Sequence, residues 1–207
     1  FLNNIDKAEN KLLAETISKY TSDDFHMRCT HPFNELKGAD NVANDLWIPI
    51  KNSFKPIQRR MDIFYAGTNL IDNHSSKWVV NMGHLLGIFN NPFLGIVPTR
   101  KAVMLWYCEF YRVENNKITE GAFFLDILKF MQQLQLPIIP ESTGMVGFNP
   151  GPMTHDGLYF NTQSEEEGQK TLDLMMRMAN RLVGGGMKTT VPDLEKDWHK
   201  DMIWWGP

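Results

Sequence analysis

Asp126 is the acid best placed for chemistry, because it stands inside the apolar run Phe123-Phe124-Leu125-Asp126-Ile127-Leu128. Removing a carboxylate from water favours its protonated form, which makes a buried acid a usable general base near neutral pH. Asp126 also stands where a strand-like segment gives way to a helix-like one, so an N-cap accepting a backbone N–H is an equal alternative. A carboxylate bound to the amides of residues 128 and 129, with no open pocket beside it, would exclude the base.

Two strand-like segments supply the next candidates, His84 in the first and Tyr107 and Glu109 in the second. A lone histidine on an apolar strand face is more often a satisfied core residue than a catalyst, but a pocket beside it would reverse that preference. Glu109 is a second acid in apolar sequence. Its alternative interpretation is an ion pair with Arg112 or Arg100 at a solvated sheet edge.

His31 opens the connection His31-Pro32-Phe33-Asn34-Glu35, which places an imidazole, an amide and a carboxylate in one short loop. Loops held by rigid elements often carry function, although a turn that satisfies backbone groups is the favoured role of Asn34. The sequence contains no GxGxxG, GxxxxGK, GxSxG, HExxH or EF-hand spacing. We therefore expect no nucleotide cofactor, no serine nucleophile and no metal site.

Composition narrows the class of protein. The 207 residues are 43% hydrophobic and carry 24 acids against 21 bases, mixed along the chain, so one sizeable core is possible and a nucleic-acid partner is not expected. No apolar stretch reaches the roughly 20 residues that span a bilayer, and the first residues lack a signal-peptide pattern. The sequence predicts a soluble, cytoplasmic protein without a membrane partner. Cys29 and Cys108 match no metal or disulfide pattern and are predicted to be reduced core thiols.

The elements that must position these residues form an α+β pattern. Helical periodicity predicts a helix over 5–19 and another after Gly38-Ala39-Asp40, shortened or kinked by Pro49. A short strand carrying Phe25 and Met27 lies between them. Four strands follow, at about 57–70, 77–89, 102–113 and 117–125. Sequential hairpins imply an antiparallel sheet, with helices over one face and a hollow between them.

The chain changes in texture after Leu136, where prolines and glycines become dense. We expect a domain over 1–136, a Pro/Gly-rich linker and helix over 137–191, and the possible start of a truncated second copy over 192–207. The first residue is not methionine, which suggests a fragment of a longer chain.

Two stretches, HPFNELKGADNV and FYRVENNKITEGAFFLDILKFMQQL, give residues 5–136 a resemblance to SnoaL-like polyketide cyclase domains, of the nuclear transport factor 2-like superfamily. The resemblance implies a cone-shaped curved antiparallel sheet around an apolar pocket, and the first copy of a tandem protein. In those cyclases an Asp near the end of the last strand is the general base of a ring closure, a role that falls on Asp126 by motif position. Helper residues are not transferred, because Gly121-Ala122-Phe123-Phe124 stands where many members carry Trp or His.

The leading hypothesis is a cofactor-independent pocket for a small apolar or polyketide-like ligand, with Asp126 as base of a cyclase or isomerase. His84 or Tyr107 would donate to the oxyanion, while His31 and Glu109 would hold the polar end of the ligand. Trp106 and Phe124 would line or fill the pocket. A non-catalytic ligand-binding or dimerisation domain is the alternative, as a homodimer or paired with a second copy. An ester or epoxide hydrolase is a third option, which requires an ordered water between two polar groups.

Overall fold

The computed structural model describes residues 1–136, 140, 151–152 and 154–202. The chain divides into two compact units, Phe1–Phe160 and Asn161–Pro207. The first unit holds every candidate residue named above. It extends past Leu136, and its last described residues form a bridge to the sheet, through Leu158 and Phe64.

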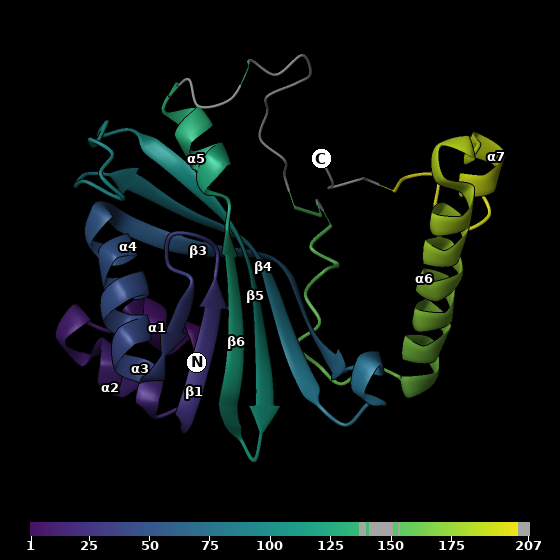
Figure 1. Ribbon diagram of the computed structural model, residues 1–207, viewed down its shortest axis with the longest axis horizontal. Helices are drawn as coiled ribbons and strands as arrows, with labels where there is room; N and C mark the ends of the chain where they lie inside the picture. Colours follow the sequence, from purple (N-terminus) through teal and green to yellow (C-terminus); the bar gives the residue numbers. More distant parts are fainter. Residues whose placement is uncertain (137–139, 141–150, 153, 203–207) are drawn as a thin grey trace. The chain divides into compact units, whose positions relative to one another are not determined.

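One six-stranded sheet forms the body of the first unit, in the order β2-β1-β6-β5-β4-β3 (Figure 1). The strands are β1 (Thr21–Cys29), β2 (Glu35–Lys37), β3 (Phe54–Thr68), β4 (Lys77–Phe89), β5 (Ala102–Glu114) and β6 (Lys117–Leu125). The hairpin-linked strands β3 to β6 are antiparallel, as the sequence predicts. The β1–β2 pair is antiparallel and the β1–β6 pair is parallel, and α3 (Gly38–Asn41), η2 (Val42–Trp47) and α4 (Ile48–Ser53) lie in the chain between β2 and β3.

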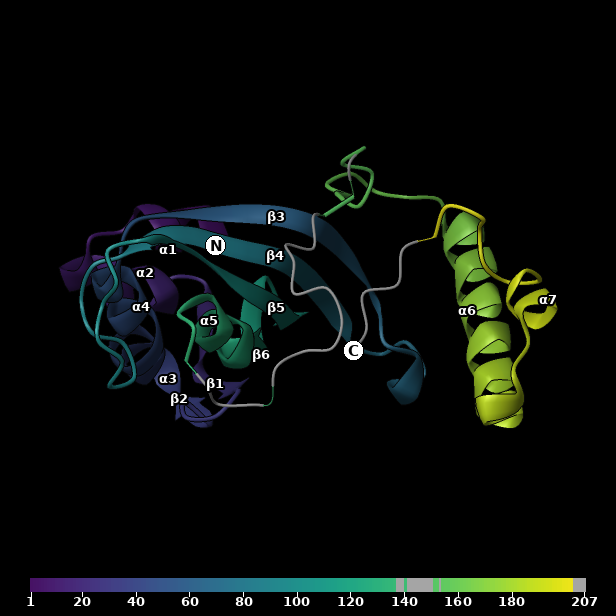
Figure 2. The same cartoon turned by 90° about the horizontal axis from the view of Figure 1, so that it is seen from above.

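The sheet bends strongly around the helices (Figure 2). The bend coincides with a register shift between Met61 and Ile63 in β3, a β-bulge that increases local twist. Gly83 of β4 lies opposite this point. A Cβ on Gly83 would come within 2.0 Å of the Arg60 carbonyl oxygen, so only glycine allows the two strands to approach there. The bend gives the sheet an inner, concave face.

Short helices gather on the inner face. They are α1 (Leu2–Lys7), η1 (Asn10–Leu12), α2 (Leu13–Ser18), α3 (Gly38–Asn41), η2 (Val42–Trp47), α4 (Ile48–Ser53) and α5 (Ile127–Gln133); η3 (Leu70–Asp72) lies in the β3–β4 connection. The helix predicted over 5–19 is interrupted, because Ala8 and Glu9 are extended. The kink predicted at Pro49 takes the form of the π-helical segment η2, just before a proline that lacks the backbone N–H and crowds the preceding turn.

The core lies between this helical layer and the inner sheet face. It is rich in aromatic rings, among them Trp47, Phe54, Phe89, Phe123 and Phe130, each no more than 2% exposed. Phe130 of α5 meets Phe54 and Phe89 edge to face at 5.5 and 5.3 Å, which closes one end of the interior. The α+β cone predicted from the sequence is confirmed.

The second unit is built on α6 (Glu165–Gly185), followed by η4 (Gly186–Lys188) and α7 (Val191–Leu194). Ser164 caps α6 by accepting the Glu167 N–H, and the helix ends in glycines. Asp197, whose side chain is 2% exposed, pairs with Arg177 at 2.8 Å and Arg181 at 3.2 Å. Residues 203–207 of the predicted second copy lie outside the described residues, so that copy stays a prediction.

No helix in the described parts of the chain is long and apolar enough to cross a bilayer.

Candidate functional site

Asp126 serves as the N-cap of α5. Its Oδ1 accepts the backbone N–H of Lys129 at 2.8 Å, and the residue is exposed. It does not line the cavity described below. The carboxylate thus accepts one of the two amides expected of a cap, which favours the capping alternative over the general base.

The remaining candidates are divided between the two faces of the sheet. Side chains alternate along β5, so Tyr107 and Glu109 face inward while Trp106 faces outward. Register then places His84 beside Trp106, and Phe124 beside Cys108, on the outer face. Trp106 and Phe124 therefore cannot fill the interior of the cone, and His84 cannot donate to a ligand held beside Tyr107.

His84 is nearly buried on this outer face, at 8% exposure. Its Nδ1 lies 3.6 Å from Asp62 Oδ2, and its ring centroid lies 5.9 Å from that of Trp106. His31 is exposed in the connection between β1 and β2, where Asn34 Nδ2 donates to the Pro32 carbonyl oxygen at 3.0 Å. Neither histidine lies among the cavity-lining residues.

Glu109 is the acid that the interior does enclose, at 0% exposure. Its Oε1 accepts from Arg59 Nη1 at 2.6 Å; its Oε2 accepts from the Tyr111 hydroxyl at 3.2 Å and from Asn81 Nδ2 at 3.4 Å. Asn81 is the residue directly opposite Glu109 in the β4–β5 register, and it also contacts the Tyr107 hydroxyl. The partner is thus neither Arg112 nor Arg100, and the pair is buried.

Burial raises the pKa of Glu109, and the hydrogen bonds from Arg59, Asn81 and Tyr111 oppose that rise. Burial likewise raises the pKa of Tyr107 to about 12. Both Glu109 oxygens are engaged by neighbouring donors. The carboxyl group is therefore held in place by the core and is not presented to a substrate.

Arg59 of β3 joins this buried acid to a second, more exposed one. Its Nε and Nη2 donate to the two carboxylate oxygens of Asp6 in α1, at 2.9 and 3.2 Å. Its guanidinium carbon lies 5.1 Å from the ring of Trp47 and 4.9 Å from that of Tyr107, within cation–π range. Burial opposes the charge, but Glu109 and Asp6 together keep the pKa of Arg59 well above its ordinary value.

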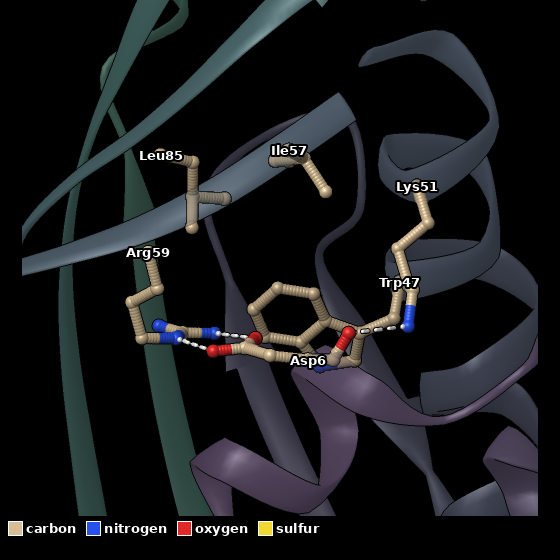
Figure 3. A pocket seen from close by; sticks show the side chains of 6 residues that line it. All are labelled: Asp6, Trp47, Lys51, Ile57, Arg59 and Leu85. Carbon is tan, nitrogen blue, oxygen red and sulfur yellow. Dashed lines mark hydrogen bonds and ion pairs between the residues drawn. The ribbon is translucent and has the colours of Figure 1, made fainter. Parts of the chain in front are cut away.

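A cavity of about 10 Å³ lies against this arginine, with room for about one water molecule. Its lining residues are Asp6, Trp47, Lys51, Ile57, Arg59 and Leu85. Figure 3 shows Arg59 and Lys51 approaching Asp6 from opposite sides, with Ile57 and Leu85 above them in this view. Around this cavity the described core side chains pack against the inner face, and the open apolar pocket predicted from the sequence stays a prediction.

One polar atom of a residue that lines this cavity lacks a partner among the described residues. The indole Nε1 of Trp47 is buried and finds no hydrogen-bond acceptor among the residues that the structure describes. A buried N–H without an acceptor costs about 1–3 kcal/mol, so a ligand oxygen here would be stabilised.

The cysteines do not offer a nucleophile. Burial raises the pKa of the Cys29 thiol to about 12 and that of Cys108 to about 11, so both stay protonated near neutral pH. Within the described ranges, no group of three or more His, Cys, Asp or Glu side chains could hold a metal ion.

Sequence reasoning missed Arg59, Asp6, Asn81 and Trp47. One available signal was the alternation of β4 and β5, which places Asn81 and Glu109 on faces that pack inward. Asp6 stands in a short helix far from β3 in sequence, and no local pattern could have paired it with Arg59.

Comparison with solved structures gives likenesses of fold. They include a proposed SnoaL-like polyketide cyclase from Jannaschia sp. CCS1, with a TM-score of 0.50 and 14% identity over 66% of this chain and 90% of that one. IdmH, a proposed polyketide cyclase from Streptomyces antibioticus, gives 0.51 and 14% over 65% and 95%. AclR, a proposed hydroxylase from Streptomyces galilaeus, gives 0.52 and 20% over 68% and 86%.

No family model and no curated protein matches the chain in sequence. The activities proposed for the similar structures differ from one another, so the likeness carries no reaction with it. The sheet order, the packed inner face and these likenesses together show that this chain has the α+β cone fold of the SnoaL-like proteins.

Proposed function

We propose that the cone domain binds a small molecule at its inner face, with Arg59 as the polar anchor, and that it does so without catalysis by Asp126. The observation that carries this proposal is the cavity beside Arg59, lined by a buried cation, two apolar side chains and an indole. Buried ion pairs contribute little to stability, and apolar side chains could fill the same space. The presence of a charged cluster in the core therefore suggests a role in binding.

Access to the site depends on its exposed rim. Trp47 and Leu85 are each 2% exposed, whereas Asp6 is exposed and Lys51 and Ile57 are half-buried. A ligand larger than water would enter past these three residues. Its apolar part would then contact Trp47 and Ile57 while a polar group meets Arg59.

Native mass spectrometry of the full chain, purified from cells, tests the proposal. Ile57→Trp fills the cavity from β3, and Gln58→Trp places the same bulk on the opposite, exposed face of the same strand. We expect a bound small molecule in the wild type and in Gln58→Trp, and its loss in Ile57→Trp. A ligand retained by Ile57→Trp would place binding elsewhere.

Hydrolysis of an ester or epoxide is the second candidate function, and one observation favours it. The cavity is the size of one water and has Asp6, Lys51 and Arg59 in its wall. A panel of esters and epoxides assayed with wild type and Asp6→Asn tests it. Turnover that disappears in Asp6→Asn would support a hydrolase, and no turnover in either protein would leave binding as the function.

A further inference from the structure

The Asp6–Arg59 pair consists of a solvent-accessible carboxylate in front of a buried guanidinium. The Asp6 side chain is 31% exposed and that of Arg59 is 4% exposed. Two parallel hydrogen bonds, from Nε to Oδ2 and from Nη2 to Oδ1, join them. This is the geometry with which arginine recognises carboxylates in general, here occupied by the chain itself.

The guanidinium is held by contacts that do not involve Asp6. Glu109 binds Nη1 at 2.6 Å on the buried side, and the rings of Trp47 and Tyr107 lie about the guanidinium carbon at 5.1 and 4.9 Å. If the Asp6 side chain turned into solvent, Nε and Nη2 would keep their positions. Two buried donors would then lack acceptors, which favours binding of another carboxylate.

Helix α1 is also held by contacts that do not involve the Asp6 carboxylate. Ile5 is fully buried, and Lys51 Nζ donates to the carbonyl oxygens of Ile5, Asp6 and Ala8 at 2.8, 3.2 and 2.6 Å. Rotation of one side chain therefore opens the site without moving the helix backbone. Lys51 stays beside the opening and adds positive charge.

We infer that the ligand of this site is a small carboxylic acid, whose carboxylate replaces that of Asp6 on Arg59, so that Asp6 is a built-in competitor. The inference rests on the proposed inner-face binding site and specifies its ligand class. Trp47 and Ile57 would contact the apolar body of the acid, and the free indole N–H of Trp47 supplies a further donor.

Calorimetric titration of the full chain with acetate and benzoate tests the inference, with acetamide and benzamide as neutral analogues. Removing the competitor in Asp6→Ala raises the affinity for the carboxylates, by about tenfold if Asp6 occupies Arg59 nine-tenths of the time. The amides gain nothing. Asp40→Ala is the matched control, because Asp40 is exposed in α3 and the same charge is lost away from Arg59.

Four outcomes would overturn the inference. Equal gains for amides and carboxylates would reject the ligand class while leaving the inner-face site intact. An equal gain in Asp40→Ala would reduce the effect to net charge. If Asp6→Ala binds no carboxylate but the Ile57→Trp comparison still shows a lost ligand, only the assignment of the ligand as a carboxylic acid is rejected. If neither experiment shows any inner-face ligand, the proposed function is rejected as well.

The Arg59 side-chain resonances of the wild type supply a second measurement that needs no variant. Benzoate shifts the Arg59 Nε–H resonance in a saturable manner, and benzamide leaves it in place. A resonance unmoved by benzoate at saturating concentration would contradict the inference even if Asp6→Ala does not fold.

Discussion

Glu109 is a carboxyl group that the core accepts because three side chains donate to it. Arg59, Asn81 and Tyr111 share its two oxygens, and all three contacts are direct. These hydrogen bonds do not fully offset the cost of burying the charged form, so the pKa of Glu109 is raised. The free energy of unfolding must therefore depend on pH through the titration of Glu109.

The first prediction concerns Glu109→Gln. Because the folded-state pKa of Glu109 lies above the ordinary 4.5, the folded protein binds this proton more tightly than the unfolded chain. The stabilisation is complete below 4.5 and is lost as the pH rises through the folded-state pKa. Urea unfolding at a series of pH values should show the free energy of unfolding of wild type falling relative to Glu109→Gln over that window.

Glu120 is the control for this experiment, with the opposite sign. Burial opposes its ionisation, but hydrogen bonds from Arg112 and Arg28 hold its pKa below the ordinary value. The advantage of wild type over Glu120→Gln is therefore present above 4.5 and is lost as the pH falls through the folded-state pKa. Parallel pH profiles for the two variants would contradict both assignments.

The second prediction separates capping from catalysis at Asp126. Replacing this N-cap by alanine should lower the free energy of unfolding by about 1 kcal/mol, while asparagine, which still accepts the Lys129 N–H, should cost less. Chemical denaturation measures both. Ligand binding or turnover should be unchanged in each variant, and an activity lost in Asp126→Asn with stability preserved would restore the base.

At the scale of the elements, the curvature that forms the inner face depends on one close approach between β3 and β4. The third prediction is that Gly83→Ala destabilises the fold by about 1–3 kcal/mol, because the added methyl group meets the Arg60 carbonyl oxygen. Gly67→Ala in β3 is the matched control, since nothing lies within 4 Å of the methyl group there. Thermal unfolding compares them, and equal midpoints would argue against a tight β3–β4 crossing.

The helical layer shows how tertiary contacts override a local pattern. Residues 5–19 have the apolar spacing of one helix and contain neither glycine nor proline. The chain nevertheless leaves the helical conformation at Ala8, because Lys51 from α4 binds the carbonyl oxygens at the end of α1. This interruption is what brings Asp6 to Arg59.

At the scale of the whole molecule, the fourth prediction concerns where the first unit ends. Phe64 of β3 donates to the Gly157 carbonyl oxygen at 2.8 Å and accepts from Tyr159 at 2.7 Å, and its ring meets Phe160 at 5.1 Å. Two lost hydrogen bonds cost about 1–3 kcal/mol. A chain ending at Leu136 should therefore unfold at a lower temperature than one ending at Phe160.

Calorimetry of the two chains checks this order. If the chain ending at Leu136 were as stable as that ending at Phe160, the boundary predicted from the sequence would be the better one.

The sequence by itself determined the fold class, the four hairpin strands and the alternation that puts Glu109 and Tyr107 on one face. Period and turn chemistry are local, so they can be read along the chain. The same alternation along β4 puts His84 on the opposite face of the strand from the residues directly before and after it. The local sequence does not encode which of the two faces packs inward.

Only the tertiary structure decided that Asp126 caps a helix, that Trp106 and Phe124 face outward, and that Arg59 stands between Asp6 and Glu109. The arginine's two ion pairs join residues some 50 positions apart in the chain. The bend of the sheet and the break after α1 create them, and neither has a local signature. Whether a charged pair is stable in the core depends on all the side chains packed around it, and not on the local sequence.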